Sequence, residues 1–330
     1  MIGRRGVITL LGGAAAAGWP LAARAQQPAM PVIGFLSSGT NPSSGRIADA
    51  FGQGLSEQGY VEGRNVEIIY RSAQQTEGFL ALAADLVRRR VALIVIPDPG
   101  TGAALAAKSA TGSIPIVFGI GSDPVESGLV ASLNRPGGNL TGVYFLNQEL
   151  TAKHLELLHK IAPNVTTVGF LVNPTNSVVK AQNREAETAA RSLGLNLTIL
   201  NATTPNEIEA AFATVVERQI GALAVDADSL FFLQRDQLAA HAARHVVPAI
   251  YSAREYVEVG GLMSYGARLS DTLRVVGSYA GRILKGANPA DLPVQQSTRI
   301  EMALNLGTAK ALGLTVPQTL LVAADEVIER

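Results

Sequence analysis

The chain has 330 residues, of which 47% are hydrophobic and 16% are charged, and its 27 basic residues balance its 27 acidic residues. This length predicts about two domains, and the composition is that of a globular protein with a sizeable core. The zero net charge and the lack of a basic block argue against nucleic acid as a partner. With no cysteine, the sequence excludes disulfides, thiol catalysis and cysteine-ligated metal.

The first 25 residues are typical of a cleaved export signal. Arg4 and Arg5 form a positive start, residues 7–17 are apolar but too few to span a membrane, and Ala23-Arg24-Ala25 fits the small-residue cleavage pattern. We therefore predict a signal peptide over residues 1–25, a periplasmic location and no stable membrane insertion. An ordinary N-terminal helix is the alternative. The paired arginines also permit twin-arginine export, so the Sec and Tat routes both stay open.

From residue 31 onward, short apolar strands alternate with helices. We predict strands over 32–37, 66–70, 93–96, 114–118, 140–145, 197–200, 222–225, 247–251 and 260–265. Helices are predicted over 47–58, 79–90, 103–110, 206–218, 234–244 and 269–284, with a short helical segment at 129–133. Strands separated by helices of this length predict an α/β fold with doubly wound parallel sheets and right-handed crossovers.

The second half of the chain repeats the plan of the first. Gly34-Phe35-Leu36 precedes a polar loop with Asn41-Pro42, and Gly169-Phe170-Leu171 precedes the polar loop 173–176. We predict two lobes whose loop edges face each other across a cleft, because ligands of open α/β sheets bind at the carboxyl ends of the strands. The alternative is two domains side by side without a shared site.

Four sequence runs carry a family resemblance. They are residues 122–139 (Ser-Asp-Pro-Val onward to Arg-Pro-Gly-Gly-Asn), 81–87, 260–266 and 305–314. In this order they resemble the ABC-transporter substrate-binding protein family that includes tryptophan-binding TrpX-type members. The resemblance covers nearly all of the chain after the leader, and its runs are specific to the family rather than to a ligand.

The resemblance implies a periplasmic binding protein type 1 fold with a hinge of three crossings. It implies an N-terminal lobe over 31–146 plus about 267–292, and a C-terminal lobe over 147–266 plus about 293–330. It also implies amino-acid-like or small aromatic solutes and an ABC permease as the membrane partner.

Several motifs of catalytic or metal-binding sites begin in this sequence but lack a required residue. Gly119 and Gly121 begin a dinucleotide fingerprint, but Pro124 stands where its third glycine should be. His241 and His245 are spaced for one helix face, but no further ligand accompanies them, so we expect a solvated face rather than a metal site. Asp226 and Asp228 form a carboxylate pair, of which one is expected to cap the next helix. We expect no catalytic residue, no metal and no cofactor.

Polar loops at the strand ends remain as the candidate ligand site. Their hydroxyls, amides and helix N-terminal N–H groups can fix a small polar solute, although each residue alone could equally serve as a cap or turn. Arginine is scarce in these loops, which argues against phosphate. The candidates are Ser37, Ser38, Thr40, Asn41, Thr101, Gly121, Ser122, Asp123, Asn173, Thr175, Asn176, Asp226, Tyr251 and Tyr265.

We expect the serines and nearby backbone N–H groups to bind a carboxylate. Asp123 or Asp226 would receive an ammonium group. Tyr251 and Tyr265 would pack against an apolar or aromatic body, with ordinary core packing as the alternative.

The sequence is thus interpreted as a periplasmic, non-enzymatic solute-binding protein of an ABC importer, which delivers a small polar or amino-acid-like solute to a permease. A ligand-presenting sensor subunit is the alternative among binding proteins, and a secreted α/β enzyme is the alternative from another class. A repressor of similar core is disfavoured, because an apparent leader rather than a helix-turn-helix precedes the first strand.

Overall fold

The computed structural model describes residues 30–38, 46–73, 78–97, 100–145, 150–176 and 179–329. The predicted signal peptide and the site candidates Thr40 and Asn41 lie outside the described residues.

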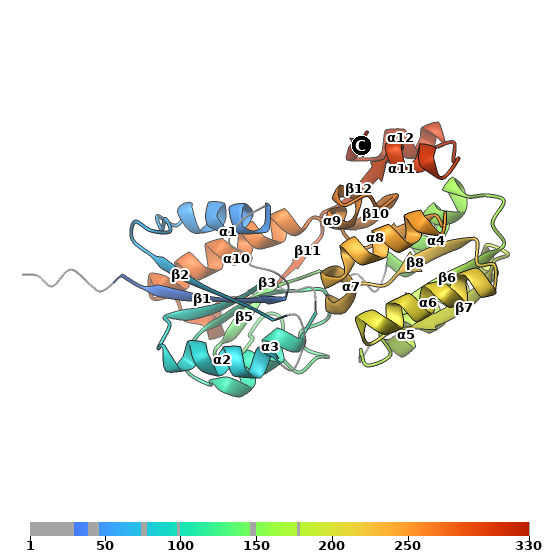
Figure 1. Ribbon diagram of the computed structural model, residues 1–330. Helices are drawn as coiled ribbons and strands as arrows, with labels where there is room; N and C mark the ends of the chain where they lie inside the picture. Colours follow the sequence, from blue (N-terminus) through green and yellow to red (C-terminus); the bar gives the residue numbers. More distant parts are fainter. Residues whose placement is uncertain are drawn as a thin grey trace, which may run out of the picture. The chain divides into compact units, whose positions relative to one another are not determined.

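Six parallel strands form the first sheet, in the order β11-β5-β4-β3-β1-β2. Its central strands are buried on both faces, so they are almost uninterrupted apolar runs. Helices α2 and α3 cover one face and α1 and α10 cover the other (Figure 1). The elements are β1 Val32–Ser38, α1 Arg46–Ser56, β2 Glu67–Ala73, α2 Gly78–Arg88, β3 Leu93–Pro97, α3 Gly102–Ala110, β4 Ile116–Ile120, β5 Leu140–Phe145, α10 Leu269–Leu284, a 3-10 turn Pro289–Asp291 and β11 Gln295–Ser297.

The second sheet has the order β13-β12-β10-β9-β8-β6-β7, and only the β10–β12 pair is antiparallel. Helices α4 and α5 pack on one face, and α6, α8 and α9 pack on the other. The elements are α4 Thr151–Ile161, β6 Thr167–Val172, α5 Val179–Ser192, β7 Asn196–Asn201, α6 Pro205–Glu217, β8 Ala222–Val225, α7 Ser229–Leu233, α8 Arg235–Arg244, β9 Ala249–Tyr251, α9 Arg254–Glu258, β10 Met263–Ala267, β12 Ile300–Asn305, α11 Leu306–Ala311, α12 Gln318–Ala323 and β13 Glu326–Ile328.

The internal repeat predicted from the sequence is confirmed by the strand order. The first sheet contains the run β2-β1-β3-β4-β5, and the second contains the equivalent run β7-β6-β8-β9-β10. The two Gly-Phe-Leu triplets occupy equivalent strands, β1 and β6. The two strands that carry these triplets therefore end at equivalent places in the two sheets.

The chain passes between the two sheets three times, after β5, after β10 and after β11. The expected division placed everything from about residue 293 with the second lobe. Strand β11 instead pairs with β5, and the Val294 backbone N–H donates to the Leu133 carbonyl at 2.8 Å. Sheet pairing therefore keeps β11 with the first sheet.

The helix predicted over 129–133 is absent, and this segment consists of bends and irregular backbone after a turn at 124–128. Both Leu129 and Val130 donate their backbone N–H to the Pro124 carbonyl, at 2.9 and 3.1 Å. Gly128 has a φ of +70°, which a right-handed helix does not accommodate. The apolar spacing in this segment serves burial of Leu129 and Val130 under a turn rather than a helix face.

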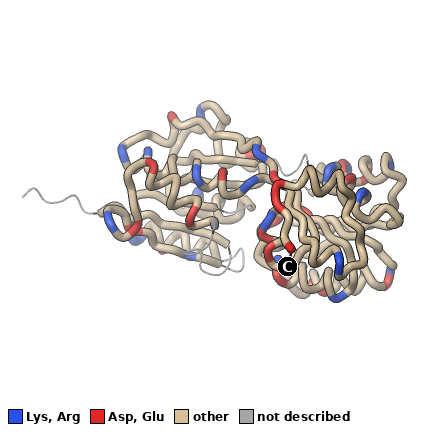
Figure 2. Tube along the Cα trace, turned by 90° about the horizontal axis from the view of Figure 1, so that it is seen from above, with Lys and Arg blue, Asp and Glu red and all other residues tan. Residues whose placement is uncertain are grey.

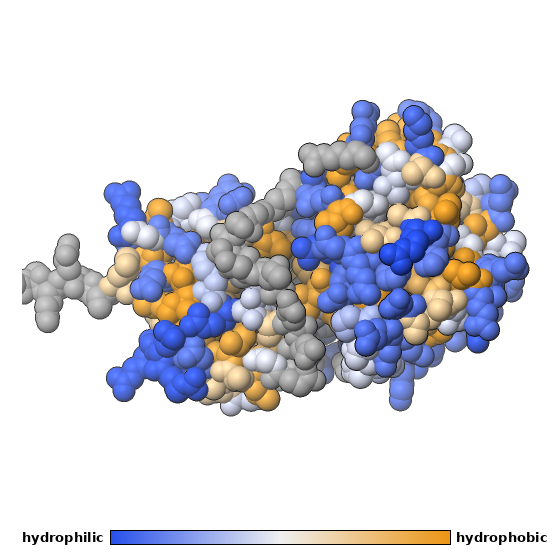
Figure 3. All heavy atoms as spheres, in the orientation of Figure 1, coloured by the Kyte–Doolittle hydropathy of each residue, from blue (hydrophilic) through white to orange (hydrophobic). Residues whose placement is uncertain are grey.

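Charged residues of both signs are interspersed along the trace (Figure 2). On the face drawn in Figure 3, hydrophobic residues are scattered among hydrophilic ones, as on ordinary protein surfaces. Among the described residues, no helix combines the length and the apolar character that crossing a membrane requires.

Candidate ligand-binding site

Four residues with hydroxyl groups lie at the carboxyl ends of the strands in the first sheet. Ser37 and Ser38 end β1, Thr101 precedes α3, and Ser122 follows β4 after the buried Gly121. The Ser37 and Ser122 hydroxyl oxygens are buried without a hydrogen-bond partner, and the Thr101 side chain makes no cap hydrogen bond. Unpaired buried hydroxyls are costly, so this edge offers donors that a ligand carboxylate would satisfy.

The Asp123 carboxylate is engaged by its own loop. Its Oδ1 atom accepts hydrogen bonds from the backbone N–H groups of Val125, at 2.6 Å, and Glu126, at 3.1 Å. Its carbonyl also accepts the Ser127 hydroxyl at 2.8 Å. These contacts stabilise the turn after β4 in the manner of an Asx turn.

In the second sheet, Asn173 organises the loop that follows β6. Its Oδ1 atom accepts from the Thr175 backbone N–H at 3.0 Å and from the Thr175 hydroxyl at 2.7 Å, while its carbonyl accepts the Asn176 N–H. The Asn173 amide donates to Asp228 Oδ1 at 3.2 Å. Asp228 in turn caps α7 by accepting the Leu230 N–H at 2.8 Å. The expectation that one of the two aspartates caps the next helix is confirmed for Asp228.

Asp226 differs from its neighbours because its carboxyl group is buried and incompletely paired. Only 4% of the residue is exposed, and its Oδ1 atom accepts a 2.7 Å hydrogen bond from the Gln182 side-chain amide on α5. The Asp226 Oδ2 atom and the Gln182 Oε1 atom are both buried without a hydrogen-bond partner. Two neighbouring side chains therefore each keep an unused acceptor atom at the end of β8.

Burial raises the pKa of the Asp226 carboxyl to about 8, and the negative charges of Asp228 and Glu185 act in the same direction. The Ala227 backbone N–H opposes the shift, but burial outweighs it. An unpaired buried carboxylate is strongly disfavoured. The site is thus arranged to accept a proton or a cationic donor.

The two candidate tyrosines lie in different cores of the second sheet. Tyr251 is fully buried and stacks on Tyr256 with ring centroids 4.5 Å apart. Tyr265 packs against the core under α4, where its carbonyl contacts His154 Nε2 at 2.5 Å. Both make core contacts in this structure, and their contact with a ligand stays a prediction.

The expected solvated histidine face is wrong for His241. This residue is buried, and its ring stacks on Phe212 with a centroid separation of 5.0 Å, while His245 stacks at 6.0 Å. Aromatic packing against α6 explains the i, i+4 spacing. Among the described residues, no group of three or more His, Asp or Glu side chains is placed to hold a metal ion.

Sequence reasoning missed Gln182, although a signal for it exists. The buried residues of α5 are Val179, Gln182, Ala186 and Ala190, which follow helical spacing. A lone polar residue on an otherwise apolar stripe marks a position that needs a polar partner, and that partner is Asp226.

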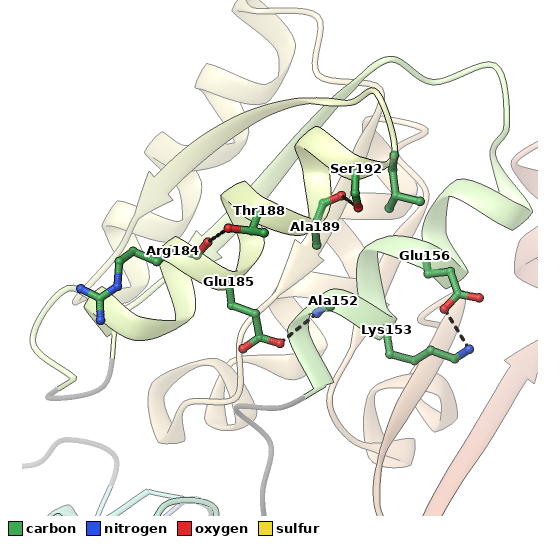
Figure 4. A pocket seen from close by; sticks show the side chains of 9 residues that line it. Ala152, Lys153, Glu156, Arg184, Glu185, Thr188, Ala189 and Ser192 are labelled. Atoms are coloured by element: carbon green, nitrogen blue, oxygen red, sulfur yellow. Dashed lines mark hydrogen bonds and ion pairs between the residues drawn. The ribbon is translucent and has the colours of Figure 1, made fainter.

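An open groove between α4 and α5 carries none of the predicted site residues (Figure 4). Glu185 spans it by accepting the Ala152 backbone N–H at 3.4 Å, and Lys153 pairs with Glu156 at 3.0 Å along its rim. The remaining lining residues are Arg184, Thr188, Ala189, Ser192 and Leu193.

Two doubly wound α/β sheets with equivalent strand orders and polar carboxyl edges define the periplasmic binding protein type 1 fold. The family model described as "ABC transporter substrate binding protein" matches residues 32–328. The chain belongs to this family, and it is therefore a substrate-binding protein rather than an enzyme.

Similar proteins agree with this family. A tyrosine-binding protein of Clostridioides difficile is 28% identical over 284 residues, covering 86% of this chain and 81% of that protein. The structure of an ABC domain from Streptococcus pneumonia in complex with L-Trp is 30% identical with a TM-score of 0.79, covering 90% of this chain and 99% of that one. A conserved domain protein from Vibrio cholerae is 27% identical with a TM-score of 0.80, at the same coverages.

Proposed function

We propose that this chain is the periplasmic amino-acid-binding subunit of an ABC importer. The observation that carries the proposal is the buried Asp226–Gln182 pair, which has two unused acceptors and a negatively charged surrounding. An ammonium group is a donor-only cation, so it would satisfy both acceptors and neutralise the buried carboxylate.

The carboxylate of the same amino acid would bind at the edge of the first sheet. Neutral donors there are the unpaired hydroxyls of Ser37 and Ser122. The N-terminus of α3 adds a favourable helix dipole, and Thr101 makes no side-chain cap at that end. A ligand held at one end by each sheet would bind in a cleft between the two lobes, with Ser38, Gly121, Asn173, Thr175 and Asn176 beside it.

The class of solute is proposed from the relatives. One is called a tyrosine-binding protein, and another was crystallised with L-Trp. Aromatic amino acids are therefore the first solutes to test. The family supports delivery to a permease, and the export signal predicted over residues 1–25 supports a periplasmic location. A ligand-presenting sensor would use the same site, and adjacent permease and ATPase genes would favour the importer.

The test is a thermal-shift screen of the purified protein against the twenty amino acids, followed by titration calorimetry. A ligand at 100 times its dissociation constant stabilises the fold by about 2.7 kcal/mol, and we expect L-tyrosine or L-tryptophan to do so. Stabilisation by sugars or phosphate esters, with none by any amino acid, would contradict the proposal.

A further inference from the structure

Among the residues that the structure describes, no cationic side chain pairs with the Asp226 carboxyl group. Its own loop contributes Asp228, and α5 contributes Glu185 and the neutral Gln182. Helix α4 packs against β8 and carries His154, whose pKa is lowered to about 4 by burial, so this imidazole is neutral near pH 7. The neighbouring strand β6 ends at Val172 and is followed by the neutral Asn173, and α9 contributes Tyr256, whose pKa burial raises well above its usual value. A carboxylate in these surroundings is stabilised only by a proton or by a cation from outside.

We propose that Asp226 holds a proton while the site is empty and exchanges it for the ammonium group of the bound amino acid, with Gln182 as the positioning residue. This inference rests on the proposed function and adds that binding releases a proton. It also assigns a role to Gln182, which accepts the second N–H of the ammonium group at its unused Oε1 atom.

The exchange balances in atoms and charge. The O–H bond of the Asp226 carboxylic acid breaks, and its proton passes to solvent. The carboxylate then accepts an N–H from the ligand ammonium, which keeps all of its own protons. The Gln182 amide remains on Asp226 Oδ1 at 2.7 Å throughout, so that Oδ2 is the oxygen that exchanges partners.

Two consequences are measurable near neutral pH, where neither the ammonium nor the carboxylate of a free amino acid titrates. At pH 7 the protein should release close to one proton for each ligand bound, because the pKa of Asp226 lies near 8 in the empty site. The affinity should weaken about tenfold between pH 7 and pH 6, because binding releases a proton and the proton activity is ten times higher at pH 6.

The experiment is titration calorimetry of the full chain with L-tyrosine and with L-tryptophan, in buffers of different ionisation enthalpy. Asp226→Asn should abolish the proton release. Glu255→Gln is the control, because burial also raises the pKa of Glu255, to about 7, and this residue on α9 is not among those proposed to contact the ammonium group. The control should leave the proton count unchanged.

Gln182→Leu separates positioning from mere packing. Loss of its amide removes a donor that stabilises the Asp226 carboxylate, so the midpoint of the pH dependence should move upward. An affinity loss with an unchanged midpoint would overturn the positioning role.

The protonation of Asp226 in the empty site can be measured directly, without ligand. Carbon-13 NMR of labelled aspartate should show a carboxyl resonance that titrates near pH 8 and disappears in Asp226→Asn. A midpoint near 4 would overturn the inference even if amino acids bind. Binding with no proton release and no pH dependence would also overturn it while leaving the proposed function intact. Failure of both amino acids to bind would overturn the exchange and the proposed function together.

Discussion

The aspartates at the strand ends differ in what their oxygens contact. Asp123 and Asp228 accept backbone N–H groups and hold turns in place, whereas the buried Asp226 accepts the Gln182 side chain at Oδ1 and leaves Oδ2 without a hydrogen-bond partner. The sequence places all three after apolar strands and does not separate them. Their difference comes from burial, because Asp226 lies against the side chain of Gln182 on α5.

The sequence predicts the polar residues at the strand ends, but it does not predict which side chains from other elements contact them. The sequence predicts Ser37 and Ser122 because they belong to polar segments at the carboxyl ends of apolar strands. Gln182 lies on a helix far from any strand end in the sequence, and only the tertiary packing of α5 brings it to Asp226. Tyr251 has a strand-end position but turns into the core against Tyr256.

His154 makes the stability depend on pH. Its buried imidazole has a pKa of about 4 in the folded state, below the usual 6.5. Because the histidine pKa is lower in the folded state, the unfolded chain binds a proton at His154 at a higher pH than the folded chain does. The contribution of His154 to the free energy of unfolding is therefore full above pH 6.5 and falls as the pH drops toward 4. Urea unfolding should therefore show that His154→Gln costs less free energy at pH 5 than at pH 7, by on the order of 2 kcal/mol.

The comparison between wild type and variant is needed because Asp226 and Glu255, with raised pKa values, act in the opposite direction over part of this range. An equal cost of His154→Gln at the two pH values would show that the imidazole is not held neutral.

At the scale of elements, the contact between α1 and α10 is made by glycines. A Cβ at Gly54 would stand 1.8 Å from the Arg274 carbonyl oxygen, and one at Gly277 would stand 2.2 Å from the Phe51 carbonyl oxygen. Only glycine allows two helix backbones to approach so closely. The packing joins the start of the chain to a helix that follows the second sheet in sequence, so it fixes α10 to the first sheet.

Gly54→Ala should lower the free energy of unfolding by about 1–3 kcal/mol or more, because backbone must move to admit the methyl group. Gly52→Ala is the matched control in the same helix, since no atom lies within 4 Å of its added Cβ. There alanine should stabilise by about 0.5–1 kcal/mol through its higher helix propensity. Chemical denaturation measures both, and a change of the same sign in the two variants would contradict the packing.

Most strands and long helices follow from the sequence because their apolar periodicity is strong and their ends carry Gly, Pro or Asn. The failures have local causes. The spacing at residues 129–133 imitates a helix, but the backbone N–H groups of Leu129 and Val130 close a turn onto the Pro124 carbonyl instead. Strand β11 has only three residues, mostly exposed, so its sequence carries no signal that it pairs with β5. Edge strands of this kind are defined by backbone pairing rather than by burial.

For the whole molecule, we expect the two lobes to close when the amino acid binds. A ligand that contacts both sheets binds the closed state better, and only such differential contact shifts the equilibrium. Small-angle scattering should therefore give a smaller radius of gyration at a saturating amino acid concentration. The Asp226→Asn variant, measured at the same ligand concentration, should close less. An unchanged radius at proven saturation would exclude a hinge mechanism.

The most direct test of amino-acid binding at Asp226 is a calorimetric cycle. Wild type and Asp226→Asn are each titrated with L-tyrosine and with 3-(4-hydroxyphenyl)propionate, which lacks the ammonium group. A hydrogen bond to a charged group contributes about 1.5–3 kcal/mol, so either change alone should weaken binding roughly 10- to 150-fold. Both changes together should weaken it little further, because they remove the same interaction. Equal affinity of wild type and Asp226→Asn for L-tyrosine would contradict the account.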